Sequence, residues 1–100
     1  MMNSGNLLKQ PFQDSFLKCL SEAKTHVNER RWDKATRDIK ETQSIWDKVV
    51  KRVQFSVERD EINNLQHSLA RLKGYIEARD QPGAFAELEE VKETWNDLGK

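Results

Sequence analysis

Residues 32 to 53 read WDKATRDIKETQSIWDKVVKRV, and this stretch decides the fold. Its apolar residues recur at alternating steps of three and four, which places them on one face of an α-helix. Only Thr42 interrupts the apolar character of this heptad-like stripe. The stretch therefore predicts a long amphipathic helix with one buried face. The positions on that face are Trp32, Ala35, Ile39, Thr42, Trp46, Val49 and Val53.

Three further stretches show the same spacing, one before this helix and two after it. Together they predict an all-α domain of four helices over residues 14–98, arranged as two tandem helical hairpins. Two arrangements stay open, an antiparallel four-helix bundle and a tetratricopeptide-like pair of hairpins. The further core positions are Phe16, Leu20, Ala23 and Val27, then Ile62, Leu65, Leu69, Leu72 and Ile76, then Ala84, Leu88, Val91, Trp95 and Leu98.

Local signals predict the N-terminal segment and the start of the first helix. Residues 1–13 contain Gly5 and Pro11 and few charges, so we expect a flexible N-terminal arm. The first helix is expected to begin behind Asp14 or Ser15, because a short side-chain oxygen accepts from the free N–H groups of a first turn. No apolar run approaches the ~20 residues of a membrane span.

The apolar spacing shifts between the second and third stripes, which predicts a turn between these helices. We expect this turn near residues 58–60, with Asp60 as the cap of the next helix. Phe55 and Val57 are expected to fill the corner.

A shift of 49 residues relates the two predicted hairpins, since it lays residues 15–51 on residues 64–100. The pattern predicts a repeated hairpin whose two copies share one core. Chance alignment of two amphipathic hairpins is the alternative. The pairs that coincide include Arg30 with Arg79, Ala35 with Ala84, Ile39 with Leu88 and Trp46 with Trp95.

The composition excludes several classes of protein. One hundred residues make a single domain. The 17 basic residues equal the 17 acidic ones, so we expect no nucleic-acid partner. The single cysteine, Cys19, cannot form an internal disulfide, and we expect it to be a half-buried small side chain. The sequence has no phosphate-binding loop, nucleophile motif or set of metal ligands, so we expect no cofactor, no metal and no enzymatic activity.

The first tight connection carries the first candidate binding residues, Arg30, Arg31 and Trp32. Tryptophan and arginine are over-represented among the residues that dominate protein–protein binding energy. Trp32 has an alternative role as an apolar plug of the corner.

The central corner carries the second set, Glu58, Asp60 and Glu61. Neighbouring carboxylates can perform acid–base chemistry only where a cleft shifts one pKa. At an exposed corner we favour anions that stabilise the start of a helix.

The last helix has an acidic outer face that includes Glu87, Glu89, Glu90 and Glu93. We favour a solvated face, with head-to-tail association of copies as the alternative. A homo-oligomer is therefore one expected form of partnership.

The runs Arg31-Trp32-Asp33-Lys34-Ala35, Trp46-Asp47-Lys48, Glu61-Ile62 and Tyr75-Ile76-Glu77 resemble an uncharacterised family of small bacterial helical proteins. The resemblance covers residues 14 to 98. It implies a helical domain outside the cytoplasm, held by one N-terminal membrane helix, and it implies no activity. The corner that often contains a histidine in that family reads Glu58-Arg59-Asp60-Glu61 here, so no role of that histidine is carried over.

These observations favour a non-catalytic protein-interaction or scaffold domain. The resemblance implies that an anchor preceding this chain tethers it to the outer face of the cell membrane. The alternative is a cytoplasmic adaptor that binds a helix or peptide in a groove between the hairpins.

Overall fold

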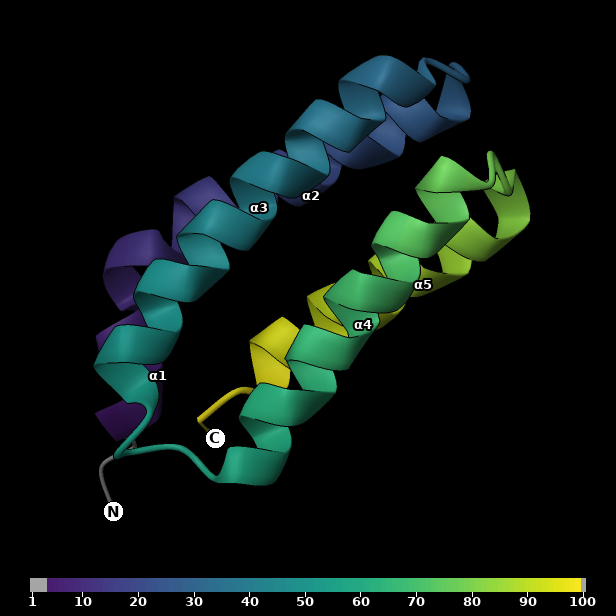
Figure 1. Ribbon diagram of the computed structural model, residues 1–100. Helices are drawn as coiled ribbons and strands as arrows, with labels where there is room; N and C mark the ends of the chain where they lie inside the picture. Colours follow the sequence, from purple (N-terminus) through teal and green to yellow (C-terminus); the bar gives the residue numbers. More distant parts are fainter. Residues whose placement is uncertain (1–3, 100) are drawn as a thin grey trace.

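The computed structural model describes residues 4–99, and its four long helices form two antiparallel hairpins (Figure 1). Helices α2 (Gln13–Asn28) and α3 (Trp32–Val53) make the first hairpin, and α4 (Arg59–Glu77) and α5 (Gln81–Asp97) make the second. Both α2 and α4 pack against α3 and also against α5. This closed arrangement is an antiparallel four-helix bundle, which decides between the two architectures left open by the sequence.

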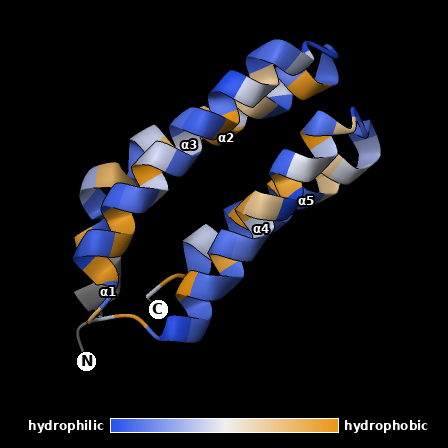
Figure 2. Cartoon of the chain, in the orientation of Figure 1, coloured by the Kyte–Doolittle hydropathy of each residue, from blue (hydrophilic) through white to orange (hydrophobic). Residues whose placement is uncertain are grey.

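The hairpin tips lie together at one end of the bundle, and the α3–α4 link lies at the other end with α1 and the C-terminal end of α5 (Figure 1). Apolar segments recur along all four long helices, separated by hydrophilic turns (Figure 2). This is the pattern of helices that each bury one stripe.

The predicted core positions are all buried except Trp32, which is half-buried and packs against the core. Trp46 and Trp95 are fully buried, and each indole N–H donates to a glutamine of the other hairpin. Trp46 Nε1 lies 2.9 Å from Gln66 Oε1, and Trp95 Nε1 lies 2.8 Å from Gln13 Oε1. The large rings fill the core while their polar edges link the two hairpins.

Both hairpin tips close with the same hydrogen-bond pattern. Arg30 and Arg79 adopt left-handed backbone conformations, with φ of 58° and 56°. Each donates its N–H three residues back, to Val27 and Ile76 respectively, at 3.1 and 3.0 Å. The following N–H reaches five residues back in both tips. These are Schellman motifs with arginine where glycine is usual, so positions 49 residues apart have equivalent geometry here.

The described part of the expected N-terminal arm is helical. Helix α1 (Ser4–Lys9) and a 3₁₀ turn (Gln10–Phe12) lead directly into α2, which begins at Gln13 without the expected cap at Asp14 or Ser15. A contact that the local sequence does not show holds this segment against the bundle. Buried Lys9 donates through Nζ to the backbone carbonyls at the end of α5. Residues 1–3 of the expected arm and Lys100 of the expected second repeat lie outside the described residues.

The link between the hairpins also differs from the prediction. The turn occupies residues 54–58, and Asp60 lies inside the first turn of α4, not at its cap. Val57 is buried as expected, but Phe55 is 93% exposed. The backbone N–H groups of Ser56 and Val57 both bond back to the carbonyl of Val53, and in this tight turn only Val57 reaches the core.

Candidate functional site

Arg30, Arg31 and Trp32 lie at the tip of the first hairpin. The Arg30 guanidinium donates to Gln81 Oε1 of the second hairpin at 3.3 Å. Arg31 forms an exposed ion pair with Glu29 at 3.2 Å. Trp32 rests against the core, as a plug of the corner does. The residues of this tip are therefore engaged within the bundle itself.

Glu58, Asp60 and Glu61 lie at the opposite end. Glu58 precedes α4, and Asp60 and Glu61 belong to its first turn. Glu61 Oε1 accepts from the Gly99 N–H at 3.1 Å and so links α4 to the residues that follow α5. Helix α3, of 22 residues and hence ~33 Å long, separates this set from the arginines and Trp32. The six candidates therefore do not form one site.

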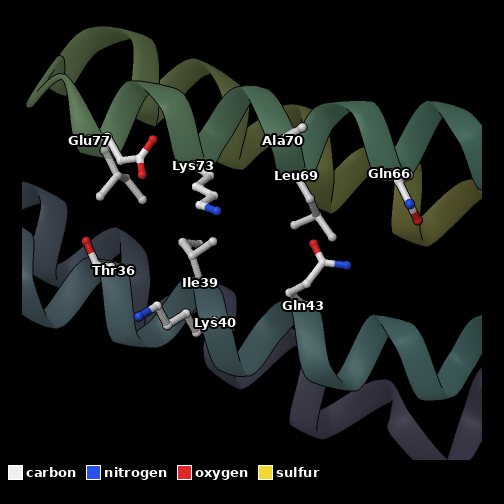
Figure 3. Close-up of a pocket in the computed structure, with 10 residues that line it drawn as sticks. Thr36, Ile39, Lys40, Gln43, Gln66, Leu69, Ala70, Lys73 and Glu77 are labelled. Atoms are coloured by element: carbon white, nitrogen blue, oxygen red, sulfur yellow. The ribbon is translucent and has the colours of Figure 1, made fainter.

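A groove of about 440 Å³ runs between the two hairpins, along α3 and α4 (Figure 3). Its apolar floor is made by Ile39 of α3 with Leu69 and Ile76 of α4, which belong to the core. Ala70 lines the α4 wall. The groove follows α4 from residue 66 to residue 77, which is about three helical turns.

The rim of this groove is polar. From α3 it receives Thr36, Lys40 and Gln43, and from α4 it receives Gln66, Lys73 and Glu77. Lys40 and Lys73 come from opposite walls (Figure 3). An apolar floor beneath a few charged groups is the common arrangement of a binding groove.

A second, smaller groove of about 300 Å³ lies between α2 and α5. Its lining residues occupy the positions of the first groove shifted by 49. The floor pairs Leu20 with Leu69 and Leu88 with Ile39, whereas the rim differs in charge. The rim residues of the second groove are Lys24, Glu89 and Lys92, in place of Lys73, Lys40 and Gln43.

Each hairpin also contains a buried acid that pairs across its two helices. Asp38 Oδ2 lies 2.5 Å from His26 Nδ1, and Glu87 Oε2 lies 3.1 Å from Arg71 Nη2. Glu87 is thus buried within the second hairpin, not part of a solvated outer face as its acidic neighbours suggested. The hydrogen bond from Arg71 to Glu87 raises the pKa of the Arg71 guanidinium. Among the described residues, no three potential metal ligands converge.

Cys19 is more buried than expected and lies 3.8 Å from Glu41 Oε2. Burial, followed by the nearby charges of Glu41 and Glu22, raises the pKa of its thiol. A thiol with a raised pKa is a poor nucleophile. The residue therefore acts as a small core side chain.

Sequence reasoning anticipated a groove between the hairpins but not its residues. Lys40 directly follows the core residue Ile39, and Lys73 lies one turn after the core residue Leu69. Such lysines border every amphipathic helix, so their type carries no special signal. Only the arrangement of the helices in the bundle, with α3 beside α4, shows which two lysines face the same groove.

The protein is a small antiparallel four-helix bundle with an open groove between α3 and α4. The chain belongs to the family described as a domain of unknown function (DUF4363), which matches residues 7–99. This confirms the expected membership of an uncharacterised family. No significant match is found among curated proteins, and none among solved structures. Within the described residues, no helix is both long and apolar enough to cross a membrane.

Proposed function

We propose that the chain is a non-catalytic protein-interaction domain that binds a segment of a partner protein between α3 and α4. The observation that carries this proposal is the groove itself, with a floor of core residues and a polar rim. It extends for about three helical turns, a length that suits a short helix or peptide. Nucleic acid is not the partner in this proposal, and no cofactor is required.

The walls of the groove support the proposal because helices and core packing fix them in place. The Trp46–Gln66 hydrogen bond joins α3 to α4 at the end of the groove nearer the link. A groove that is formed before binding saves the partner the cost of ordering it.

We further propose that the two hairpins are copies of one repeated unit. The equivalent tips, the buried acids and the two grooves, all 49 residues apart, support this. Only one of the two grooves is proposed to bind the partner.

For location, we propose the membrane-tethered, extracytoplasmic placement that the family resemblance implies. An anchor joined ahead of α1 would hold the bundle by its link end and direct the hairpin tips away from the membrane (Figure 1). Protease protection of the protein in intact cells and in permeabilised cells tests this. Degradation in both supports an outer location, and degradation only after permeabilisation overturns it.

The test of the groove uses a displayed library of random 16-residue peptides panned against the domain. Ala70→Trp places a large ring in the first groove, and Ser21→Trp places the same ring at the equivalent position of the second. Both positions are exposed, so both variants should fold. We expect selected peptides to lose binding to Ala70→Trp and to keep binding to Ser21→Trp. Absence of binders, or equal loss in both variants, contradicts the proposed function.

A further inference from the structure

We infer that the segment bound between α3 and α4 is an acidic amphipathic peptide. Its apolar side chains lie on the floor formed by Ile39, Leu69 and Ile76, and at least one of its carboxylates lies between Lys40 and Lys73. This inference rests on the proposed function, and it specifies the chemistry of the partner.

The two lysines carry the argument. Lys40 projects from α3 and Lys73 from α4, so the two ammonium groups border the same stretch of floor (Figure 3). Among the described residues, neither ammonium group has an ion-pair or hydrogen-bond partner. A carboxylate placed between them would gain two charge-assisted contacts above an apolar surface.

Most other polar groups of the rim are already engaged. Thr36 Oγ1 donates to the Trp32 carbonyl at 2.8 Å, and Gln43 donates to Asp47 at 3.0 Å. Gln66 Oε1 accepts from the Trp46 indole. The charged groups of the rim are therefore the ones that select the partner.

The remaining charge, Glu77, gives the groove a direction. It lies one helical turn from Lys73 toward the hairpin tips. A carboxylate of the partner is attracted to the middle of the groove, at the lysines, and repelled at its tip end. The acidic residue of the peptide is thus expected near the centre of its bound length.

The second groove shows what a different rim does. Position 89 holds glutamate where position 40 holds lysine, and Lys24 corresponds to Lys73. On the α5 wall of the second groove, Glu89 is accompanied by Lys92, and Lys24 borders the groove from α2. Each rim thus has two lysines and one glutamate, but the glutamate is placed differently. In the first groove Glu77 lies at the tip end and Lys40 borders the middle, whereas in the second groove Glu89 occupies the position of Lys40.

The decisive variant is Lys40→Glu, which gives position 40 the charge that the second groove has at the equivalent position, Glu89. The matched control is Lys24→Glu, the same change on the wall of the second groove. The probe is the tightest peptide from the 16-residue library, together with a version in which each Glu and Asp is replaced by Gln and Asn. Affinity is measured by titration calorimetry, and the site is located by amide chemical shifts.

We expect the selected peptides to contain acidic residues between apolar ones. Lys40→Glu should weaken binding by about tenfold or more, as should the amide version of the peptide, whereas Lys24→Glu should leave it unchanged. The largest chemical-shift changes should fall at Ile39, Leu69 and Ala70.

Neutral or basic peptides that bind the groove and tolerate Lys40→Glu overturn the acidic partner but keep the proposed function. If the library yields no peptide whose binding depends on the groove, both the acidic partner and the proposed function are overturned. Two further measurements test other occupants. A dimer that Ala70→Trp disrupts in sedimentation assigns the groove to a second copy, and binding to phosphatidylglycerol vesicles that Lys40→Glu abolishes assigns it to a lipid surface. Either result overturns the peptide inference.

Discussion

The two hairpins place different chemistry on equivalent positions. Asp38 and Glu87, 49 residues apart, are both buried on the second helix of a hairpin and both pair with its first helix. Asp38 pairs with the imidazole of His26, whereas Glu87 pairs with the guanidinium of Arg71. The two acids occupy equivalent positions, but their partners do not, because His26 corresponds to Tyr75 and Arg71 corresponds to Glu22.

The grooves extend the same comparison to the surface. Their floors share two equivalent positions, but the first groove has a volume of about 440 Å³ and the second of about 300 Å³. At the position of Thr36 the second hairpin carries Phe85, a larger side chain that packs against the core. The two hairpins thus share a similar spacing of core residues, while the rim residues of the two grooves differ in where they place their charges.

The largest expected effect separates Trp46 from Trp95. Replacing either by alanine removes a fully buried ring, which costs about 3–5 kcal/mol of unfolding free energy. Trp95→Ala should cost more, because this ring also stacks on Phe16 at a centroid distance of 4.0 Å and lies beneath the Lys9 ammonium. Urea unfolding followed by circular dichroism measures both values.

Either alanine variant can fail to fold in a domain of this size, so the phenylalanine variants keep the order testable. Trp95→Phe should still be less stable than Trp46→Phe. Equal losses of unfolding free energy, or a larger loss at Trp46, would show that the contacts of Trp95 with Phe16 and Lys9 add no stability beyond that of a buried ring.

The next effect concerns the N-terminal segment, which contacts both hairpins. Lys9 is buried and donates to carbonyls at the end of α5, and Arg52 of α3 donates to the Leu8 carbonyl from an exposed position at 3.2 Å. Lys9→Met removes a charged donor from the Trp95 and Asn96 carbonyls and a cation from a helix C-terminus, at a cost of about 1–3 kcal/mol. Arg52→Met should cost less than about 1 kcal/mol.

Thermal unfolding of the two variants compares these contacts directly. If Arg52→Met proves the more damaging, the segment is held mainly by the first hairpin, and the capping of α5 by Lys9 contributes little.

The apolar spacing predicted the core well because the buried face of a helix is a local, periodic property. Trp46 and Trp95 are buried for the same reason as their neighbours three and four residues away. The shift of 49 residues also paired Arg30 with Arg79, which occupy equivalent left-handed positions. No glycine marked those tips, so their conformation could not be predicted from residue type.

Contacts between distant segments escaped prediction. Lys9 is buried because it meets the end of α5, 86 residues further along the chain, and nothing near it in the sequence signals this. Phe55 is exposed because the turn directs Val57 inward instead. Lys40 and Lys73 share a groove only after α3 and α4 become neighbours. In each case the missing information is which elements meet.

A smaller effect is expected from two glycines that only the second hairpin has in its helices. The first hairpin carries Thr25 and Lys34 at the positions of Gly74 and Gly83. A Cβ at Gly74 meets nothing within 4 Å, so Gly74→Ala should stabilise the domain by about 0.5–1 kcal/mol.

Gly83 is the matched contrast, because a Cβ there would collide with the ring of Tyr75. Gly83→Ala should therefore destabilise by about 1 kcal/mol. Urea unfolding should give opposite signs for the two variants, and equal signs would show that Tyr75 does not pack closely on α5.

The smallest effect compares Cys19 with Ser68, its equivalent in the second hairpin. The pKa of the Cys19 thiol is raised in the folded protein, first by burial and then by Glu41. The folded protein therefore keeps a thiol proton that the unfolded chain releases as the pH rises. This contribution to stability is fully present below the ordinary thiol pKa and is lost as the pH rises through the folded pKa.

Cys19→Ser removes this titrating group and copies the residue of the second hairpin. Between about pH 7 and pH 10, the wild type should lose more unfolding free energy than Cys19→Ser, by less than about 1 kcal/mol. Urea unfolding of the two proteins at each pH measures this difference. Parallel losses would mean that the Cys19 thiol is as solvated in the folded protein as in the unfolded chain. Its position would then differ from that of Ser68, which is buried.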